Sequence, residues 1–207
     1  MDRFEKKRRK TAFLGIVFSL SVLLVSSLYL QDQKEKTASA QVFHEKEVLM
    51  LPQIEHEEET VVLPMNIHAK QILSYYSSEK SEAELLDAVT EYQGVYRPSQ
   101  SIGYGFDGRS FEVTAMVSGV VSDVYEDELM GKCVQVDCGY GVMITYQSLS
   151  STALEKGNQV VQNQVIGYAG ENRYHADLGI HAQITVHKDG HLMDPEELID
   201  RKLSEIR

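Results

Sequence analysis

An uncharged, mostly apolar run near the N-terminus limits what this chain can fold into. It covers residues 12–30 (AFLGIVFSLSVLLVSSLYL) and lies just after the basic stretch KKRRK. At the helical rise these 19 residues span about 28 Å, roughly one bilayer core. A buried core helix is the weaker alternative, because soluble helices this apolar seldom sit beside such a basic cluster. We therefore expect a membrane-spanning helix over residues 11–30.

The charges on either side of the run predict its orientation. Residues 1–10 carry six basic and two acidic side chains, whereas only Lys34 and Lys36 follow soon after the run. The positive-inside rule then makes residues 1–10 a cytoplasmic tail of a single-pass membrane protein with its domain outside. The triplet Ala38-Ser39-Ala40 resembles a signal-peptidase site, so a cleaved leader is the alternative. The length of the apolar run and the charged spacer QDQKEKT favour a retained anchor.

The remainder of the chain is acidic, which excludes some functions. The net charge of the whole sequence is −11 and that of the basic tail is +4, so the rest carries −15. Such a body is poorly suited to binding nucleic acid or other polyanions. The sequence also lacks Walker-type and dinucleotide-type glycine loops. We expect no nucleic-acid partner and no cofactor.

Two segments precede the domain. Residues 31–63 are polar and acidic (EHEEET), as in a stalk. Residues 64–98 are expected to form a helical lead-in, with a capping box that opens a helix over residues 82–92. Its buried stripe would contain Leu85, Leu86 and Val89. The stripe is expected to pack on the main domain, and a partner-binding groove is the alternative.

Short β-forming runs follow one another from Ser110 onward. They include FEVTAMV, CVQVDC, VMITYQSL and HAQITVHKDG, and Gly, Asn and Asp turns separate them. The sequence Lys188-Asp189-Gly190 predicts a hairpin. This spacing predicts a mainly β fold, a sandwich or barrel of about 90 residues. A helical tail over residues 195–206 is expected to end the chain, with 197–207 as its own segment.

The two cysteines are read as free thiols. Cys133 and Cys138 flank a predicted strand, and five extended residues separate Cα atoms by about 16 Å. That distance is too long for a disulfide unless the chain bends sharply before Cys138. We expect two free, partly buried thiols, and the sequence has neither a CxxC pair nor a cysteine ligand set for zinc.

Histidines gather near the end of the chain. On a strand, His181 and Gln183 would leave the same face, where two imidazoles could hold a metal but an amide could not. His175, His187 and His191 lie nearby in the sequence, so a metal site of different composition is an alternative. Because His187 would be roughly 20 Å from His181 along a strand, we favour surface and turn histidines.

Residues 99–196 resemble the lysostaphin-like (LytM-type) zinc endopeptidases. Six blocks occur in that family's order and spacing: VTA (113–115), SGVV (118–121), YQSLS (146–150), GNQVVQNQVIGYAG (157–170), GIHAQI (179–184) and DGHLMDP (189–195). The resemblance implies the family's duplicated hybrid motif, a β-sandwich or barrel core. In active members, a His-x-Gly-x-Asp block and the second histidine of a His-x-His block bind zinc. The first histidine of that pair and one in a Tyr-x-His-Leu block assist the reaction.

The resemblance assigns this chain a degenerate site. Ser101, Gly105 and Gln183 fall on the ligand positions, Ser148 falls on one assisting histidine, and His181 is retained. A hydroxyl, a missing side chain and a neutral amide are too weak a set to hold zinc. Without the metal, water keeps a high pKa and is a poor nucleophile. The resemblance therefore implies a pseudoenzyme with no catalytic residue and no metal, and an active hydrolase with a rearranged site is the alternative.

A narrower resemblance is to the stage II sporulation protein Q family of endospore-forming Firmicutes. It rests on PMNIHAKQILSYY (64–76), residues 81–96 and RSFEVTAMVSGVV (109–121). It implies a forespore membrane protein that faces the space between forespore and mother cell. The implied partner is a mother-cell membrane protein of the stage III sporulation protein AH type, bound during engulfment and in a later channel complex. A peptidoglycan-binding or amidase-activating regulator is the alternative.

Overall fold

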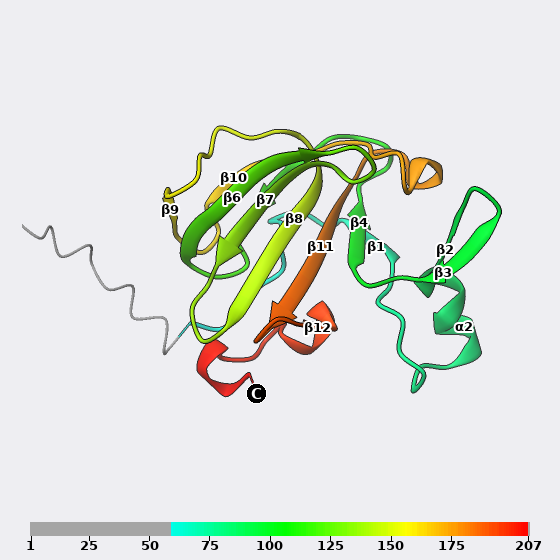
Figure 1. Ribbon diagram of the computed structural model, residues 1–207, viewed down its shortest axis with the longest axis horizontal. Helices are drawn as coiled ribbons and strands as arrows, with labels where there is room; N and C mark the ends of the chain where they lie inside the picture. The colour runs from blue at the N-terminus through cyan, green and yellow to red at the C-terminus, as the bar shows by residue number, and fades with distance from the viewer. Residues whose placement is uncertain (1–58, 207) are drawn as a thin grey trace, which may run out of the picture. The chain divides into compact units, whose positions relative to one another are not determined.

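The computed structural model describes residues 59–206, which form a β domain (Figure 1). The predicted cytoplasmic tail, the predicted membrane span and most of the predicted stalk lie outside this part of the chain. Within residues 59–206 no helix is long and apolar enough to span a bilayer. The mainly β prediction is confirmed.

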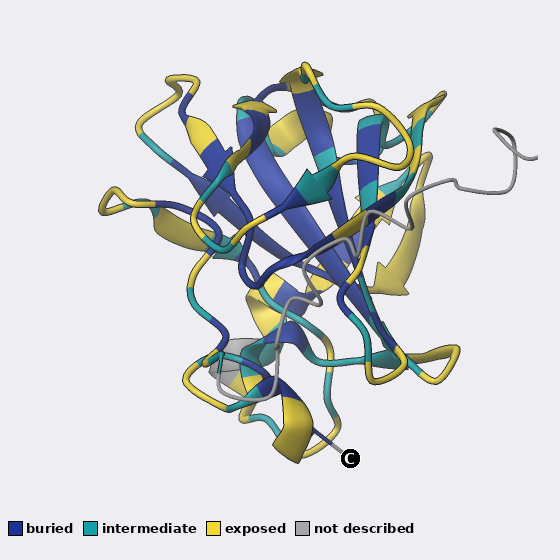
Figure 2. Cartoon of the chain, turned by 90° about the vertical axis from the view of Figure 1, so that its left-hand side faces the viewer, coloured by how far each residue is buried: buried dark blue, intermediate teal, exposed yellow. Residues whose placement is uncertain are grey.

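One antiparallel sheet organises the domain. Its strands run in the order β1 (Lys70–Leu73), β4 (Ile102–Gly105), β11 (His181–Lys188), β8 (Val142–Ser151), β7 (Gly131–Asp137), β6 (Gly119–Asp127) and β9 (Gln159–Val160). Three short strands complete it off this path: β5 (Glu112–Thr114) pairs with β10 (Val165–Ala169), β10 also pairs with β8, and β12 (His191–Met193) pairs with β11. The central strands are buried along most of their length (Figure 2).

The two faces of the central strands have different chemistry. Ile184 lies opposite Tyr146, and Val186 lies opposite Ile144, and all four side chains are fully buried in the core. Because side chains alternate along a strand, the residues between them leave the other face. Apart from Met143, which lies opposite His187, these residues of β11 and β8 are polar: His181, Gln183, Thr185, His187, Thr145, Gln147. The apolar face builds the core and the polar face builds the candidate site.

The predicted hairpin at Lys188-Asp189-Gly190 is confirmed. Lys188 of β11 lies opposite His191 of β12, so Asp189 and Gly190 form a two-residue turn. Both turn residues have positive φ, 50° and 82°, as a type I′ turn requires. The hairpin brings β12 alongside β11 at one end of the polar face.

The predicted helix over residues 82–92 is wrong. The helix α2 (Glu82–Leu85) makes one turn, the 3-10 helix η2 (Leu86–Ala88) follows, and the chain then forms β2 (Val89–Tyr92) and β3 (Val95–Pro98). Gln93 and Gly94 both have positive φ and join these strands in a tight hairpin. The β-branched and aromatic residues at the end of the predicted helix favour strands. The predicted stripe is not buried, since Leu86 is 79% exposed.

Both ends of the domain also differ from expectation. Val61, assigned to the stalk, is fully buried, and its N–H donates to the carbonyl of Arg201. The predicted C-terminal helix is two 3-10 turns, η4 (Pro195–Glu197) and η5 (Leu203–Glu205), separated by Asp200 at a φ of 64°. Asp200 donates its N–H to the carbonyl of Val61, so the chain pairs with the start of the domain and does not continue as a helix. Leu203 is fully buried there.

Both cysteines are free, as predicted. Cys133 and Cys138 are fully buried rather than partly buried. Burial raises the pKa of the Cys133 thiol to about 11, so it stays protonated and unreactive at neutral pH.

Candidate functional site: a neutral polar centre beside a cleft

Three neighbouring strands bring four of the five predicted site residues together. Ser101 immediately precedes β4, His181 and Gln183 lie on β11, and Ser148 lies on β8. The antiparallel register places Gln183 opposite Gln147 of β8 and His181 opposite Gly105 of β4. Ser101, Ser148, His181 and Gln183 are all buried.

Asn172 lies at the middle of this group, and no sequence motif had marked it. Its Nδ2 atom donates to Ser148 Oγ at 2.6 Å and to Gln183 Oε1 at 3.2 Å, and lies 3.3 Å from His181 Nε2. It lies in the loop between β10 and β11, where no periodic pattern distinguishes a buried amide from an exposed one. Its side chain joins strands β8 and β11.

The hydrogen bonds fix the tautomer of His181. Its Nδ1 atom lies 2.7 Å from the carbonyl oxygen of Gly179, which can only accept, so we assign the ring proton to Nδ1. Nε2 is then an acceptor, and the Ser148 hydroxyl lies 3.1 Å from it. Burial lowers the pKa of His181, which favours this neutral ring.

The network continues to the start of β4. Gln183 Nε2 donates to Ser101 Oγ at 2.7 Å, and Ser99 Oγ donates to the Ser101 carbonyl at 2.9 Å. Every member from Ser99 to His181 is therefore satisfied by a neutral partner. We call the set Ser101, Ser148, Asn172, His181 and Gln183 the polar centre.

His175 borders the polar centre as a second neutral histidine. Its backbone N–H donates to Asn172 Oδ1 at 2.6 Å, and its ring lies edge-on to that of His181 with centroids 6.1 Å apart. Burial, together with the charge that His181 would carry, lowers the pKa of His175 to about 4. Both rings are uncharged at neutral pH.

Gly105 does not belong to the polar centre. A Cβ atom placed on it would lie 2.9 Å from Ile72 Cδ1, and one on Gly103 would lie 3.0 Å from Leu73 Cβ. Strand β1 of the lead-in therefore occupies the space into which side chains at these β4 positions would project. A ligand from this position would have to displace Ile72.

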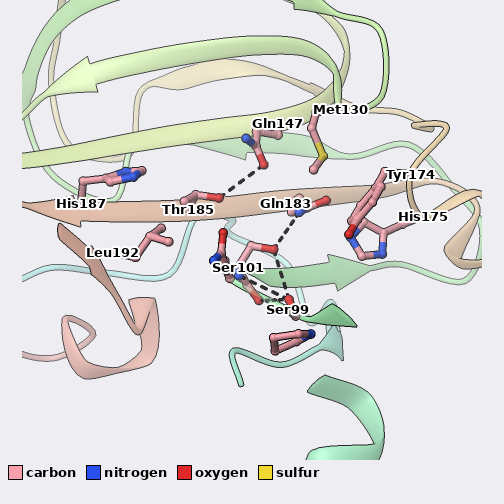
Figure 3. Close-up of a pocket in the computed structure, with 12 residues that line it drawn as sticks. Ser99, Ser101, Met130, Gln147, Tyr174, His175, Gln183, Thr185, His187 and Leu192 are labelled. Atoms are coloured by element: carbon pink, nitrogen blue, oxygen red, sulfur yellow. Dashed lines mark hydrogen bonds between the residues drawn. The ribbon is translucent and has the colours of Figure 1, made fainter. Parts of the chain in front are cut away.

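An open cleft of about 230 Å³ adjoins the polar centre (Figure 3). Gln147, Gln183 and Thr185 from β8 and β11 face it, with Leu192 of β12 at one end and Tyr174 at the other. The remaining lining residues are Pro98, Ser99, Gln100, Ser101, Met130, His175 and His187. None carries a carboxylate, and the walls present hydroxyls and amides together with aromatic and apolar side chains.

The donor set does not fit a zinc ion. Zinc in a hydrolase requires three strong protein donors, whereas the assigned positions offer a hydroxyl, an amide and no side chain. Between residues 59 and 206 no three His, Cys, Asp or Glu side chains are grouped to hold a metal. The histidines do not form a site of different composition: His187 lies toward the far end of β11, and His191 is exposed on the hairpin.

The Ser148–His181 pair is also closed to substrates. Both residues are fully buried, and neither lines the cleft. The Ser148 hydroxyl additionally accepts from Asn172, which keeps it in the network. The arrangement is suited to holding strands together and to presenting a neutral surface.

Comparisons with known proteins identify related sequences. Residues 100–195 match peptidase family M23 (Peptidase_M23). Stage II sporulation protein Q of Bacillus subtilis (strain 168) is 35% identical over 136 residues, 65% of this chain and 48% of the relative. The match thus spans about half the length of that curated relative.

Solved structures with a similar fold include a chain of a sporulation complex and a zinc peptidase. A chain in the structure of the SpoIIQ-SpoIIIAH pore forming complex is 34% identical, with a TM-score of 0.67 over 70% of this chain and 94% of that chain. A zinc containing peptidase from Vibrio cholerae is 15% identical, with a TM-score of 0.52 over 66% of this chain and 39% of that chain, and shows the fold alone. The chain therefore belongs to the stage II sporulation protein Q family and carries a domain of peptidase family M23.

Proposed function

We propose that this protein is a non-catalytic, membrane-anchored scaffold. It binds a stage III sporulation protein AH-like protein of the mother-cell membrane, across the space between mother cell and forespore. One observation carries the proposal: Ser101 and Gln183, two of the three positions assigned to zinc ligands, belong to a neutral hydrogen-bonded network, and the third, Gly105, has no side chain, while the peptidase fold is kept. The similarity to a chain of the SpoIIQ-SpoIIIAH complex supports the choice of partner.

The proposal includes the sequence-based topology. Residues 1–10 are cytoplasmic, residues 11–30 span the forespore membrane, and an acidic stalk carries the domain outward. A stalk of about thirty residues reaches tens of ångströms from a membrane. The protein would then act during engulfment and in the assembly of a forespore channel.

A binding titration tests this function. The full chain is placed in nanodiscs and titrated with the soluble part of the stage III sporulation protein AH relative from the same organism. We expect saturable 1:1 binding that is unchanged by a chelator and changed less than about twofold by His181→Ala, because a buried network residue makes no contact with a partner. No binding, or binding that needs a metal, would overturn the proposal.

The cleft favours a second candidate, a peptidoglycan-binding regulator. Its amide and hydroxyl walls could hydrogen-bond a peptide without cleaving it. Sedimentation with purified sacculi separates the candidates: retention of the full chain on sacculi that Gln147→Ala and Thr185→Ala abolish would support the regulator. Release of muropeptides that a chelator stops would contradict both candidates, since it would require an active metal site.

A further inference from the structure

The β2–β3 hairpin stands beside the main sheet as a separate two-stranded sheet (Figure 1). Directly opposite residues of an antiparallel pair share a face, and consecutive residues alternate between faces. Thr90 with Arg97 and Tyr92 with Val95 therefore form one face. The other face is formed by the pairs Val89–Pro98 and Glu91–Tyr96.

The first face is fixed to the domain. Thr90 is buried, and its hydroxyl lies 3.5 Å from His175 Nδ1. The Tyr92 ring packs on Tyr174 with centroids 5.2 Å apart, and Tyr174 in turn meets His175 edge-on at 4.8 Å. His175 is held by Asn172. Asn172 of the polar centre thus supports the hairpin through His175.

The second face is exposed and, apart from Glu91, apolar. Tyr96 is 73% exposed and Val89 is 39% exposed, and Pro98 is exposed beside them. Leu86, on the turn that leads into β2, is 79% exposed. Leu86 and Tyr96 are the two most exposed large apolar side chains within residues 59–206. We call Val89, Tyr96 and Pro98 of the hairpin, together with Leu86 of the preceding turn, the outer face of the hairpin; Pro98 also lines the cleft.

The charges around the outer face have one sign. Asp87, Glu82 and Glu91 are exposed on or beside it. The one lysine of this segment, Lys80, is already paired with Asp194 and Glu196, and Arg97 lies on the opposite face of the hairpin. An apolar centre edged by carboxylates is complementary to an apolar segment flanked by basic side chains.

The same charges disfavour other occupants. A second copy of the chain in a two-fold dimer would bring carboxylates against carboxylates. Anionic lipid headgroups and nucleic acid would be repelled as well. A protein segment that carries lysine or arginine beside apolar side chains is the occupant that fits.

We propose that the outer face of the hairpin is the docking surface for such a basic, apolar segment of a protein partner. This inference rests on the proposed partner-binding function and names the surface that performs it. Asn172 of the polar centre then has a positioning role, because it holds His175, and the Tyr174 ring packs between His175 and the hairpin. The cleft is not needed for this contact.

The test compares two matched double variants of the full chain in nanodiscs. Leu86→Gln with Tyr96→Ser alters the outer face, and Val161→Gln with Tyr168→Ser alters two exposed apolar residues elsewhere. The probe is the soluble part of the stage III sporulation protein AH relative from the same organism. We expect at least about a tenfold loss of affinity for the first variant and less than about a twofold change for the second. Circular dichroism and thermal unfolding check that both remain folded.

A charge variant tests the contribution of the acidic residues around the outer face. Asp87→Lys should weaken binding at low salt and lessen the dependence of affinity on salt concentration, because it removes the complementary charge. Unchanged binding by the folded outer-face variant would overturn the inference and leave the proposed function intact. An absence of binding by the unaltered chain would overturn the proposed function and the inference with it.

Discussion

The side-chain amide of Gln183 donates a hydrogen bond of 2.7 Å to the hydroxyl of Ser101, which joins β11 to the residue before β4. By resemblance to the zinc endopeptidases, both residues stand where metal ligands stand. A metal would hold these positions together through coordination, whereas here neutral hydrogen bonds do so. The polar centre therefore contributes to stability and positioning.

Replacing Gln183 with leucine should destabilise the domain. The change removes the donor to the Ser101 hydroxyl, which keeps only the longer contact with Ser99 Oγ at 3.4 Å, and one partner of Asn172, and both groups are buried. A buried polar group left without a partner costs about 1–3 kcal/mol. Urea unfolding of Gln183→Leu measures the loss. The control is Gln147→Leu, whose side chain is half-buried on the cleft wall and contacts Thr185 at 3.4 Å. Equal losses for the two variants would show that the network carries no special stability.

His175 should make the domain less stable in mild acid. Its folded-state pKa of about 4 lies below the ordinary value of 6.5, so the unfolded chain binds the proton more tightly. The stabilisation is fully present above about pH 6.5 and is lost as the pH falls from there toward about 4. Unfolding free energies measured across this window should fall less for His175→Gln than for the unaltered chain.

His187→Gln provides the control for this pH series, because it removes a half-buried histidine from the cleft wall and leaves His175 in place. Its stability should decline with pH as that of the unaltered chain does. A pH dependence that His175→Gln leaves intact would assign the acid sensitivity to other groups.

Leu203 should behave as a core residue although it lies in the predicted tail. Its side chain is fully buried, and its N–H donates to the carbonyl of Glu59. Leu203→Ala should lower the free energy of unfolding by about 2–5 kcal/mol, the usual cost of such a cavity. Leu63 is exposed and lies near Glu59 at the start of the described residues. Leu63→Ala should therefore change the free energy of unfolding by less than about 0.5 kcal/mol. A comparably small loss for Leu203→Ala would mean that the C-terminus does not support the core.

Local pattern was sufficient where a segment's own residues decide its structure. Ala182, Ile184 and Val186 alternate with polar residues, which favours a strand, and Asp189-Gly190 favours its turn. The alternation does not show that the polar face of this strand is buried as well. The family blocks likewise brought Ser101, Ser148 and Gln183 to attention as positions of one site. The expected strand agrees with the structure because the alternation of apolar and polar residues sets the register of β11 against β4 and β8.

Local sequence pattern failed to predict structure and burial where contacts with distant segments determine them. Val61 directly follows the acidic run EHEEET, and it is buried where the chain near Asp200 pairs with it. Leu85 and Val89 have helical spacing, but the Gln93–Gly94 turn and the contact of Thr90 with His175 favour a hairpin. Asn172 is an isolated loop amide, and its role depends on side chains from three other positions. No local propensity encodes such tertiary pairings.

Rebuilding a zinc site should require a change in the lead-in as well as in the site. Ser101→His, Gly105→Asp and Gln183→His would restore the family's three ligand types at their assigned positions. The aspartate at position 105 would project toward Ile72, whose Cδ1 already lies 2.9 Å from a Cβ placed there. We expect this triple variant to bind zinc weakly, and the further change Ile72→Ala to increase the affinity at least about tenfold by freeing that space.

Competition with a chromophoric chelator measures both affinities, and Leu73→Ala serves as the control because Leu73 lies over Gly103 instead. Tight zinc binding by the triple variant without the Ile72 change would contradict the inference that β1 closes this end of the site.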